Sequence, residues 1–224
     1  MPEPDPAKAG GLFLMHPVTV FDNIRIEAPR ERIYRRLGYR RGITRMSALQ
    51  DAEVDTSIVQ ALALIRLQGA ARRLPIRKRD EAQVILAADG GETALVSRTL
   101  AGFLGGGNEV LLMGATAGSA IVDAIREDVG GSHVTRGVIF DAVASETVDA
   151  SLDWIMAYFR QELRRENKFL TDKRYSAGYG DFLLENQRSF VRFLDLQRIG
   201  VELTASCVLV PEKSVTAVAG IGGR

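Results

Sequence analysis

One long stretch of the chain, from about Val134 to Leu163, carries apolar side chains at helical spacing. Residues three or four positions apart lie on one face of a helix, so the spacing predicts a helix with a continuous apolar stripe. A helix of this kind has to bury its stripe against another layer of secondary structure. The stripe consists of Ile139, Val143, Val148, Leu152, Ile155 and Phe159.

The rest of the chain mixes further helices and strands. Ser47 is a suitable N-cap for the second helix and Gly69 a suitable stop. Because strands do not alternate strictly with helices, a doubly wound parallel sheet is disfavoured. The pattern favours an α+β fold, a single domain with a curved, mainly antiparallel sheet flanked by helices. Helices are expected over 30–38, 47–69, 97–104, 117–126 and 183–198, and strands over 18–26, 74–79, 83–88, 110–113, 202–209 and 214–219.

The composition is that of a soluble globular protein, with 46% hydrophobic and 25% charged residues. A chain of 224 residues fits one domain, expected over 13–224 behind a disordered tail at 1–12. No apolar run reaches the roughly 20 residues that span a bilayer, and the proline-rich start lacks a signal-peptide pattern. A single cysteine excludes an internal disulfide framework. These features favour a cytoplasmic protein that is not bound to a membrane.

The net charge of +1 indicates no class of partner by itself. Seven arginines and one glutamate nevertheless lie between Arg30 and Arg45. These basic stretches are either solvated faces or a docking surface for an acidic partner or an anionic ligand. Nucleic acid is not expected, because the overall charge is balanced. A second basic cluster consists of Arg72, Arg73, Arg77, Lys78 and Arg79.

Residue types for nucleophilic or metal chemistry are sparse. His16 and His133 lie far apart and lack the neighbours of a metal site, so no bound metal is expected. Cys207 lies in an apolar strand pattern, which indicates a small buried side chain. The segment 114–118 runs from a strand to a helix and could bind an anion, although close strand–helix packing explains its small residues equally well.

The most informative stretch is 174–181, with the sequence RYSAGYGD, in a predicted loop between two helices. Its arginine fork suits a carboxylate. An aromatic face suits a purine or a sulfonium cation, and glycines allow the backbone to approach a ligand closely. Together these groups suit S-adenosylmethionine. An ordered loop anchored by a tyrosine would give the same pattern.

The segment RYSAGYG resembles the RxxxGY signature of the activation domain of cobalamin-dependent methionine synthase. Downstream, PEKSV at 211–215 resembles the PxxSV segment of that family, and the helix through 145–149 resembles the family helix that supplies an acidic ligand contact. The resemblance covers roughly residues 30–222, and the chain is similar to small stand-alone members of the family.

The resemblance implies a reactivation component that binds S-adenosylmethionine and supports reductive methylation of cob(II)alamin. Cobalamin would come from a partner, either a methionine synthase core or another corrinoid protein. One electron would come from a flavodoxin-like donor. The chain would position the reactants as an accessory part of the methyltransferase, so no catalytic residue is implied.

Family ligand contacts carry over to this sequence residue by residue. Arg174 would hold the carboxylate of the methionine moiety, and Tyr179 would lie near the sulfonium or the corrin. Asp149 would accept from the amino or ribose end, with Glu146, one turn away, as the alternative. The remaining matched positions, which would border the ligand or the cobalamin interface, are Ala177, Gly178, Ser214 and Val215.

The sequence departs from the family at three contacts. An early acidic residue and a late tyrosine have no counterpart, and Gly180-Asp181-Phe182 replaces a run of proline and histidine. Two other functions therefore remain open. One is a non-catalytic module that docks on or caps a corrinoid protein without using S-adenosylmethionine. The other is an unrelated soluble α+β enzyme.

Overall fold

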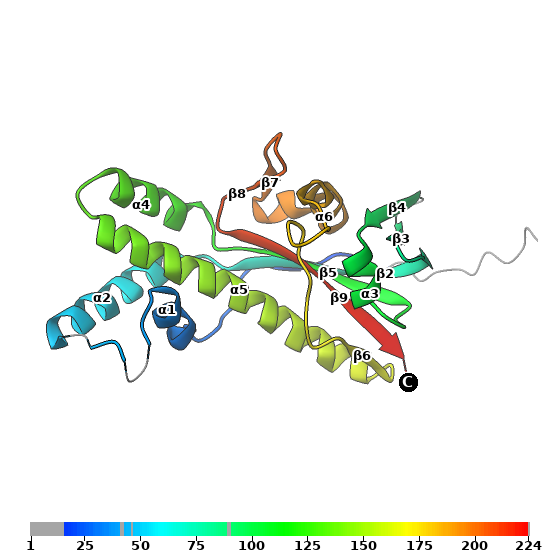
Figure 1. Cartoon of the computed structure of the whole chain (residues 1–224), viewed down its shortest axis with the longest axis horizontal. Coiled ribbons are helices and arrows are strands. Elements are labelled where there is room, and N and C mark those ends of the chain that lie inside the picture. Colours follow the sequence, from blue (N-terminus) through cyan, green and yellow to red (C-terminus); the bar gives the residue numbers. More distant parts are fainter. Residues whose placement is uncertain (1–15, 41–42, 46, 89–90, 224) are drawn as a thin grey trace, which may run out of the picture.

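The computed structural model describes residues 16–40, 43–45, 47–88 and 91–223. Within these ranges the chain forms a seven-stranded sheet in the order β4-β3-β2-β5-β9-β6, with β1 also paired to β2 (Figure 1). A separate hairpin joins β7 to β8. The strands are β1 (Thr19–Phe21), β2 (Gln68–Arg79), β3 (Gln83–Ala88), β4 (Gly91–Val96), β5 (Glu109–Thr116), β6 (Lys168–Leu170), β7 (Glu202–Leu203), β8 (Leu209–Val210) and β9 (Ser214–Gly223).

The central strands are apolar on both faces, because their side chains alternate between two cores. In β5, Leu111 and Met113 enter one core while Val110 and Leu112 enter the other. The pairings of this sheet are antiparallel, with Met113 opposite Ala71 of β2 on one side and opposite Ala217 of β9 on the other. A sheet buried on both faces needs a layer of helices on each side.

Helices supply these two layers. Residues of α1, α2, α4 and α5 form the core on one face, and residues of α3, α6 and η3 form the core on the other. Figure 1 shows α5 running diagonally across the sheet. The helices are α1 (Arg30–Arg36), α2 (Ala48–Leu64), α3 (Arg98–Phe103), α4 (Ser119–Gly130), α5 (Val134–Arg164) and α6 (Gln187–Leu194), with short 3-10 turns η2 (Leu184–Asn186) and η3 (Leu196–Ile199).

Close packing of α5 on the sheet depends on Gly69 in β2. A Cβ atom at this position would lie 2.9 Å from Cδ1 of Ile155 and 3.0 Å from Cδ1 of Ile24. The Cδ1 ends of these two side chains would have to move to make room for a Cβ atom, so glycine at this position lets Ile155 of α5 rest directly on the strand. Gly114 of β5 has the same role on the opposite face, where an added Cβ would lie 2.8 Å from Cδ2 of Leu196.

The predicted fold class is confirmed: the chain is an α+β domain with an antiparallel sheet flanked by helices. The long helix predicted over 134–163 corresponds to α5, and Ser47 caps α2 as expected, through a capping box with Gln50. The expected disordered tail at 1–12 lies outside the described residues, so the domain boundary at residue 13 stays a prediction. None of the described helices is long and apolar enough to cross a membrane.

Several predicted element bounds were wrong for identifiable reasons. Gly69 does not stop a helix: α2 ends at Leu64, and Gly69 lies inside β2, where pairing with β1 and β5 overrides its local preference. The helix expected over 183–198 is divided by Asp195, which has a φ of 49°. The strand expected over 202–209 is a hairpin in which Cys207 has a φ of 63°, although its side chain is buried as predicted.

The second basic cluster is a solvated face only in part: Arg77 and Lys78 are exposed, whereas its first two members are not. Arg72 and Arg73 are buried, because strand alternation turns them toward the two cores. Nε of Arg72 donates to the carbonyl of His16 at 3.0 Å. Arg73 donates to Glu109 at 2.8 Å and to Glu166 at 2.5 Å, which neutralises its charge inside the protein.

Replacing Gly69 by alanine should destabilise the protein by about 1 kcal/mol, because the new methyl group displaces the Cδ1 ends of Ile155 and Ile24 and lies 3.2 Å from the Gly114 carbonyl oxygen. Gly102→Ala is the matched control. Gly102 lies inside α3 with no atom within 4 Å of an added Cβ, so this change should stabilise the protein by about 0.5–1 kcal/mol. Urea unfolding measures both. Equal midpoints of urea unfolding for Gly69→Ala and Gly102→Ala would contradict the packing described for α5.

Candidate functional site

An acidic edge runs along the solvent side of α5. Glu146, Asp149 and Asp153 are three and four residues apart, so they lie on one side of the helix. The neighbouring positions Val148 and Leu152 are buried in the core under α5. Burial of the apolar stripe therefore fixes the rotation of the helix and directs the three carboxylates outward.

Arg174 reaches this edge from the segment that follows β6. The backbone of the next residue, Tyr175, is tied to β9, since its N–H donates to the Val218 carbonyl at 2.9 Å and its carbonyl accepts from the Val218 N–H at 2.8 Å. This pairing holds the segment alongside the sheet. The side chain of Arg174 then extends to α5, where it is only 18% exposed.

Both terminal nitrogens of Arg174 are occupied. Nη2 donates to Oδ1 of Asp149 at 2.7 Å and to its carbonyl at 3.2 Å. Nη1 donates to Asp153 and lies 3.9 Å from the sulfur of Met156. Burial alone would lower the pKa of Arg174, but the hydrogen bonds and charges of Asp149 and Asp153 outweigh it and raise this pKa.

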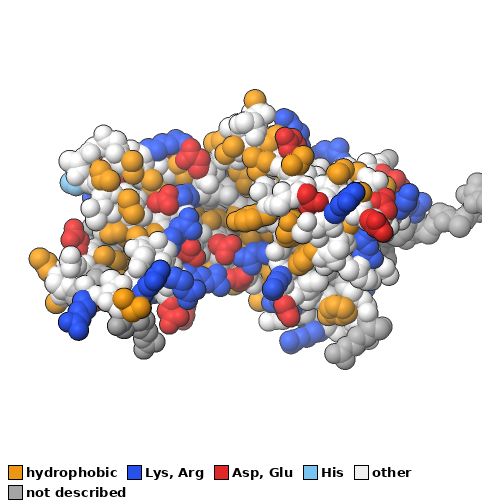
Figure 2. All heavy atoms as spheres, viewed as in Figure 1, with side chains coloured by type: hydrophobic (Ala, Val, Ile, Leu, Met, Phe, Trp, Pro, Cys, Tyr) orange, Lys and Arg blue, Asp and Glu red, His pale blue; other side chains and the backbone are white. Residues whose placement is uncertain are grey.

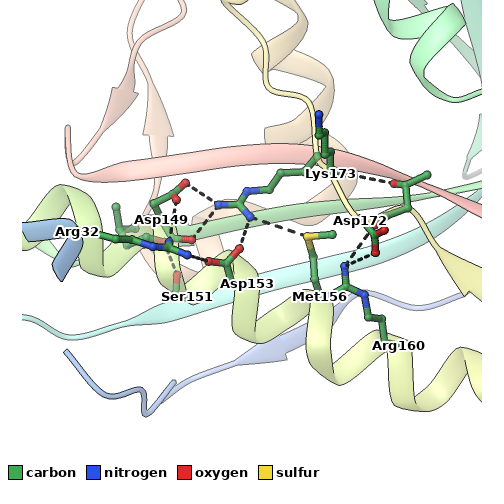
Figure 3. Close-up of polar contacts among 11 residues, drawn as sticks. Arg32, Asp149, Ser151, Asp153, Met156, Arg160, Asp172 and Lys173 are labelled. Carbon is green, nitrogen blue, oxygen red and sulfur yellow. Dashed lines mark hydrogen bonds and ion pairs between the residues drawn. The ribbon is translucent and has the colours of Figure 1, made fainter. Parts of the chain in front are cut away.

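Arginines of α1 face the same edge from the other side. Arg32 lies 2.8 Å from a carboxylate oxygen of Asp153 and 3.5 Å from one of Asp149. Arg36 donates to Glu146 at 3.1 Å. Figure 3 shows Arg32 pointing at Asp149 and Asp153. Part of the first basic cluster is thus matched to acids of α5.

A cavity of about 520 Å³ lies where α1, α5 and the Arg174 segment meet, and we call it the α1–α5 cavity. Figure 2 shows blue and red side chains alternating over this part of the surface. Its volume lies in the range of small-molecule sites. The mixture of cations and anions suits a ligand that carries both charges. The residues that line it are Arg32, Arg35, Arg36, Glu146, Asp149, Asp153 and Arg174.

The structure brings together three of the residues predicted from the sequence, namely Arg174, Asp149 and Glu146, in this cavity. The glycine–tyrosine part of the loop does not line it. Tyr179 is 68% exposed, and Gly178 has a φ of 94° and donates its N–H to the Phe182 carbonyl at 2.7 Å.

The other predicted positions also lie outside the cavity. Ala177 is buried in the core under α6. Ser214 donates its hydroxyl to Oγ1 of Thr116 at 2.9 Å, and Val215 packs against the core under α5. Contacts of these residues with a ligand or a partner stay predictions.

Asp181 anchors the loop that carries Tyr179. Its carboxylate accepts from the hydroxyl of Ser97 at 2.6 Å and from the N–H of Arg98 at 2.7 Å, at the start of α3. The hydrogen bond from Ser97, followed by those from α3, lowers the pKa of Asp181 to about 2. The loop is therefore fixed to the N-terminus of α3 by a charged cap.

Four residues of the cavity were not predicted from the sequence. Asp153 follows Asp149 by one helical turn, and this spacing was a usable signal for a second carboxylate. Arg32, Arg35 and Arg36 were seen as part of a basic cluster, but nothing in the sequence indicates that α1 lies across α5. In the described part of the chain, no group of histidine, cysteine and acidic side chains has the arrangement of a metal site.

No protein-family model matches the sequence, and a sequence comparison with curated proteins found no relative. Comparison with solved structures found the crystal structure of the MetH reactivation domain bound to AdoHcy, with a TM-score of 0.63. The chain has the fold of the MetH reactivation domain. The match covers 91% of this chain and 78% of that chain at 12% identity. The architecture expected from the activation-domain resemblance is thereby confirmed at the level of the fold.

Asp153 should make the stability of the protein depend on pH. Burial alone would raise its pKa, but hydrogen bonds and charges of Arg174 and Arg32 lower it below the unfolded value of 3.8. The ionised carboxylate thus stabilises the fold above that value, and this contribution is lost as pH falls through the lower folded pKa. Asp153→Asn should be less stable than wild type at pH 7, and the difference should shrink below about pH 4.

Urea unfolding at a series of pH values measures this effect. Asp22→Asn is the control, because Asp22 is exposed and makes no ion pair within the described chain. A constant difference between wild type and Asp153→Asn from pH 7 to pH 2 would contradict the role given to this carboxylate.

Proposed function

We propose that this chain binds S-adenosylmethionine in the α1–α5 cavity and supports reductive methylation of cob(II)alamin on a partner protein. The partner is a methionine synthase core or another corrinoid protein, and a flavodoxin-like donor supplies the electron. One observation carries the proposal: Arg174, Asp149 and Glu146, the residues indicated by the activation-domain resemblance, line one cavity. The fold match to the MetH reactivation domain bound to AdoHcy supports it, since AdoHcy is S-adenosylmethionine without the methyl group.

The residues of the cavity fit the amino-acid end of this ligand. A carboxylate such as Asp149, 45% exposed, is available to an ammonium group. The arginines of α1 supply donors for a carboxylate. A volume of about 520 Å³ accommodates a ligand of this class.

In this proposal the chain contributes positioning and exclusion of water, not a nucleophile. Cobalamin held by the partner supplies the nucleophilic metal centre. Tyr179 projects from the anchored loop and offers an exposed aromatic face to the sulfonium or the corrin. Ala177, Gly178, Ser214 and Val215 would border the ligand or the partner, as the resemblance implies.

One observation favours a second function, a docking module that caps a corrinoid protein without using S-adenosylmethionine. The terminal nitrogens of Arg174 are satisfied by Asp149, Asp153 and Met156. A former ligand site that has become structural would have closed internal ion pairs of this kind. The two functions differ in whether the chain has to bind the methyl donor.

Calorimetric titration with S-adenosylmethionine tests the proposed function. Wild type should bind, and Arg174→Ala should bind at least about tenfold more weakly, because a charge-assisted network is lost. Arg160→Ala is the control: it removes one positive charge from α5 outside the cavity, where Arg160 contacts Asp172 at 3.7 Å. Equal affinities for wild type and Arg174→Ala would contradict the site.

A second assay separates the two functions. The chain is mixed with the cobalamin-binding domains of a methionine synthase loaded with cob(II)alamin, a reductant and S-adenosylmethionine. Formation of methylcobalamin, followed by absorbance, is expected only when wild type is present. A complex that forms without S-adenosylmethionine and yields no methylcobalamin would favour the docking module instead.

A further inference from the structure

The α1–α5 cavity has one arginine more than its carboxylates balance. Of the lining residues in the described chain, four are arginines and three are acids. Arg174 and Arg32 share the two aspartates, and Arg36 pairs with the glutamate. Arg35 has no carboxylate partner anywhere in the described ranges, and no ion pair joins it to Glu31, one turn earlier on α1. The uncompensated positive charge of the cavity therefore lies on Arg35.

Arg174 is poorly placed to bind a further carboxylate. Each of its terminal nitrogens already has two acceptors, from Asp149 at Nη2 and from Asp153 and Met156 at Nη1. A ligand carboxylate would have to displace at least one aspartate. That aspartate would then face an incoming negative charge across a half-buried site, which is unfavourable.

Neither of these two limitations of Arg174, its occupied nitrogens and the displaced aspartate, applies to Arg35. Its side chain is exposed and lines the α1–α5 cavity together with an adjoining cavity of about 330 Å³. Binding of a carboxylate there breaks no ion pair. The guanidinium fork also allows two parallel hydrogen bonds to a carboxylate.

We infer that Arg35, rather than Arg174, holds the carboxylate of the ligand, and that the ligand carries a zwitterionic amino-acid group. Asp149 and Asp153 face the ammonium end of that group. Arg174 is a positioning residue whose hydrogen bonds hold the two aspartates in place on α5. This inference rests on the proposed function, because it assigns the chemical groups of the ligand at the same site.

Two ligands separate the roles of the two arginines. S-adenosylmethionine carries both charges of the amino-acid group, whereas decarboxylated S-adenosylmethionine keeps the ammonium and lacks the carboxylate. Arg35→Ala should weaken binding of S-adenosylmethionine about tenfold or more and change binding of the decarboxylated ligand less than about twofold. Arg174→Ala should weaken both ligands by a similar factor, because it acts through the aspartates.

Arg30→Ala is the matched control. It removes the same charge from the same helix, but Arg30 pairs with Asp55 and does not line the α1–α5 cavity. It should change the affinity for either ligand less than about twofold. Thermal unfolding of each variant checks that the fold is kept, and loss of an exposed arginine such as Arg35 should leave it intact.

The possible results distinguish failure of the inference about Arg35 from failure of the proposed function. If Arg174→Ala, and not Arg35→Ala, loses affinity only for the ligand with a carboxylate, the inference is overturned while the proposed function stands. The same holds if Arg35→Ala binds S-adenosylmethionine as wild type does. If wild type binds neither ligand, alone or with the corrinoid partner present, the proposed function fails and the inference fails with it.

Discussion

The packing of α5 against the glycine-containing strands sets the position of every acidic residue in the α1–α5 cavity. Ile155 rests on Gly69, and Val148 and Leu152 are buried beside it. Full burial of each such side chain is worth about 1.5–3 kcal/mol, so the helix cannot rotate without a large loss of stability. Asp149 and Asp153 lie on the side of α5 that faces solvent and not the core. The same helix thus provides the centre of the fold and one wall of the candidate site.

Arg174 connects that wall to the sheet. Its backbone segment is paired with β9 through Tyr175, while its side chain is paired with α5. A half-buried guanidinium is stable only when its charge is matched, and the two aspartates match it. Arg32 then offsets the second negative charge from α1. The cavity is therefore held by alternating charges from three segments far apart in the sequence, and a ligand that carries both charges could enter with little loss of pairing.

The parts of the fold that follow from local periodicity were predictable. The helix over 134–163 and the antiparallel α+β class depend on patterns within the sequence itself. Gly69 was misassigned because a glycine after an apolar helical run is usually a stop, whereas here its role is set by Ile155, which is far away in the chain. Arg72 and Arg73 were misassigned for the same reason, since Glu109 and Glu166 neutralise Arg73 only in the folded chain.

The candidate site was predictable only in part. Arg174, Asp149 and Glu146 came from the resemblance to activation domains, and no spacing rule could have joined residue 174 to residue 149. Asp153 could have been predicted from its helical spacing to Asp149. Arg35 was not, because its importance depends on which neighbouring arginines are already paired. Charge pairing across elements is a property of the tertiary structure and leaves little trace in a single sequence.

A crystal structure of the chain with bound S-adenosylmethionine tests the proposed site most directly. We predict a ligand in the α1–α5 cavity, with its carboxylate on Arg35, its ammonium beside Asp149, and the Arg174 ion pairs intact. A ligand bound elsewhere on the protein would contradict the proposed site. A ligand in the cavity whose carboxylate has displaced the aspartates from Arg174 would contradict the assignment of Arg35.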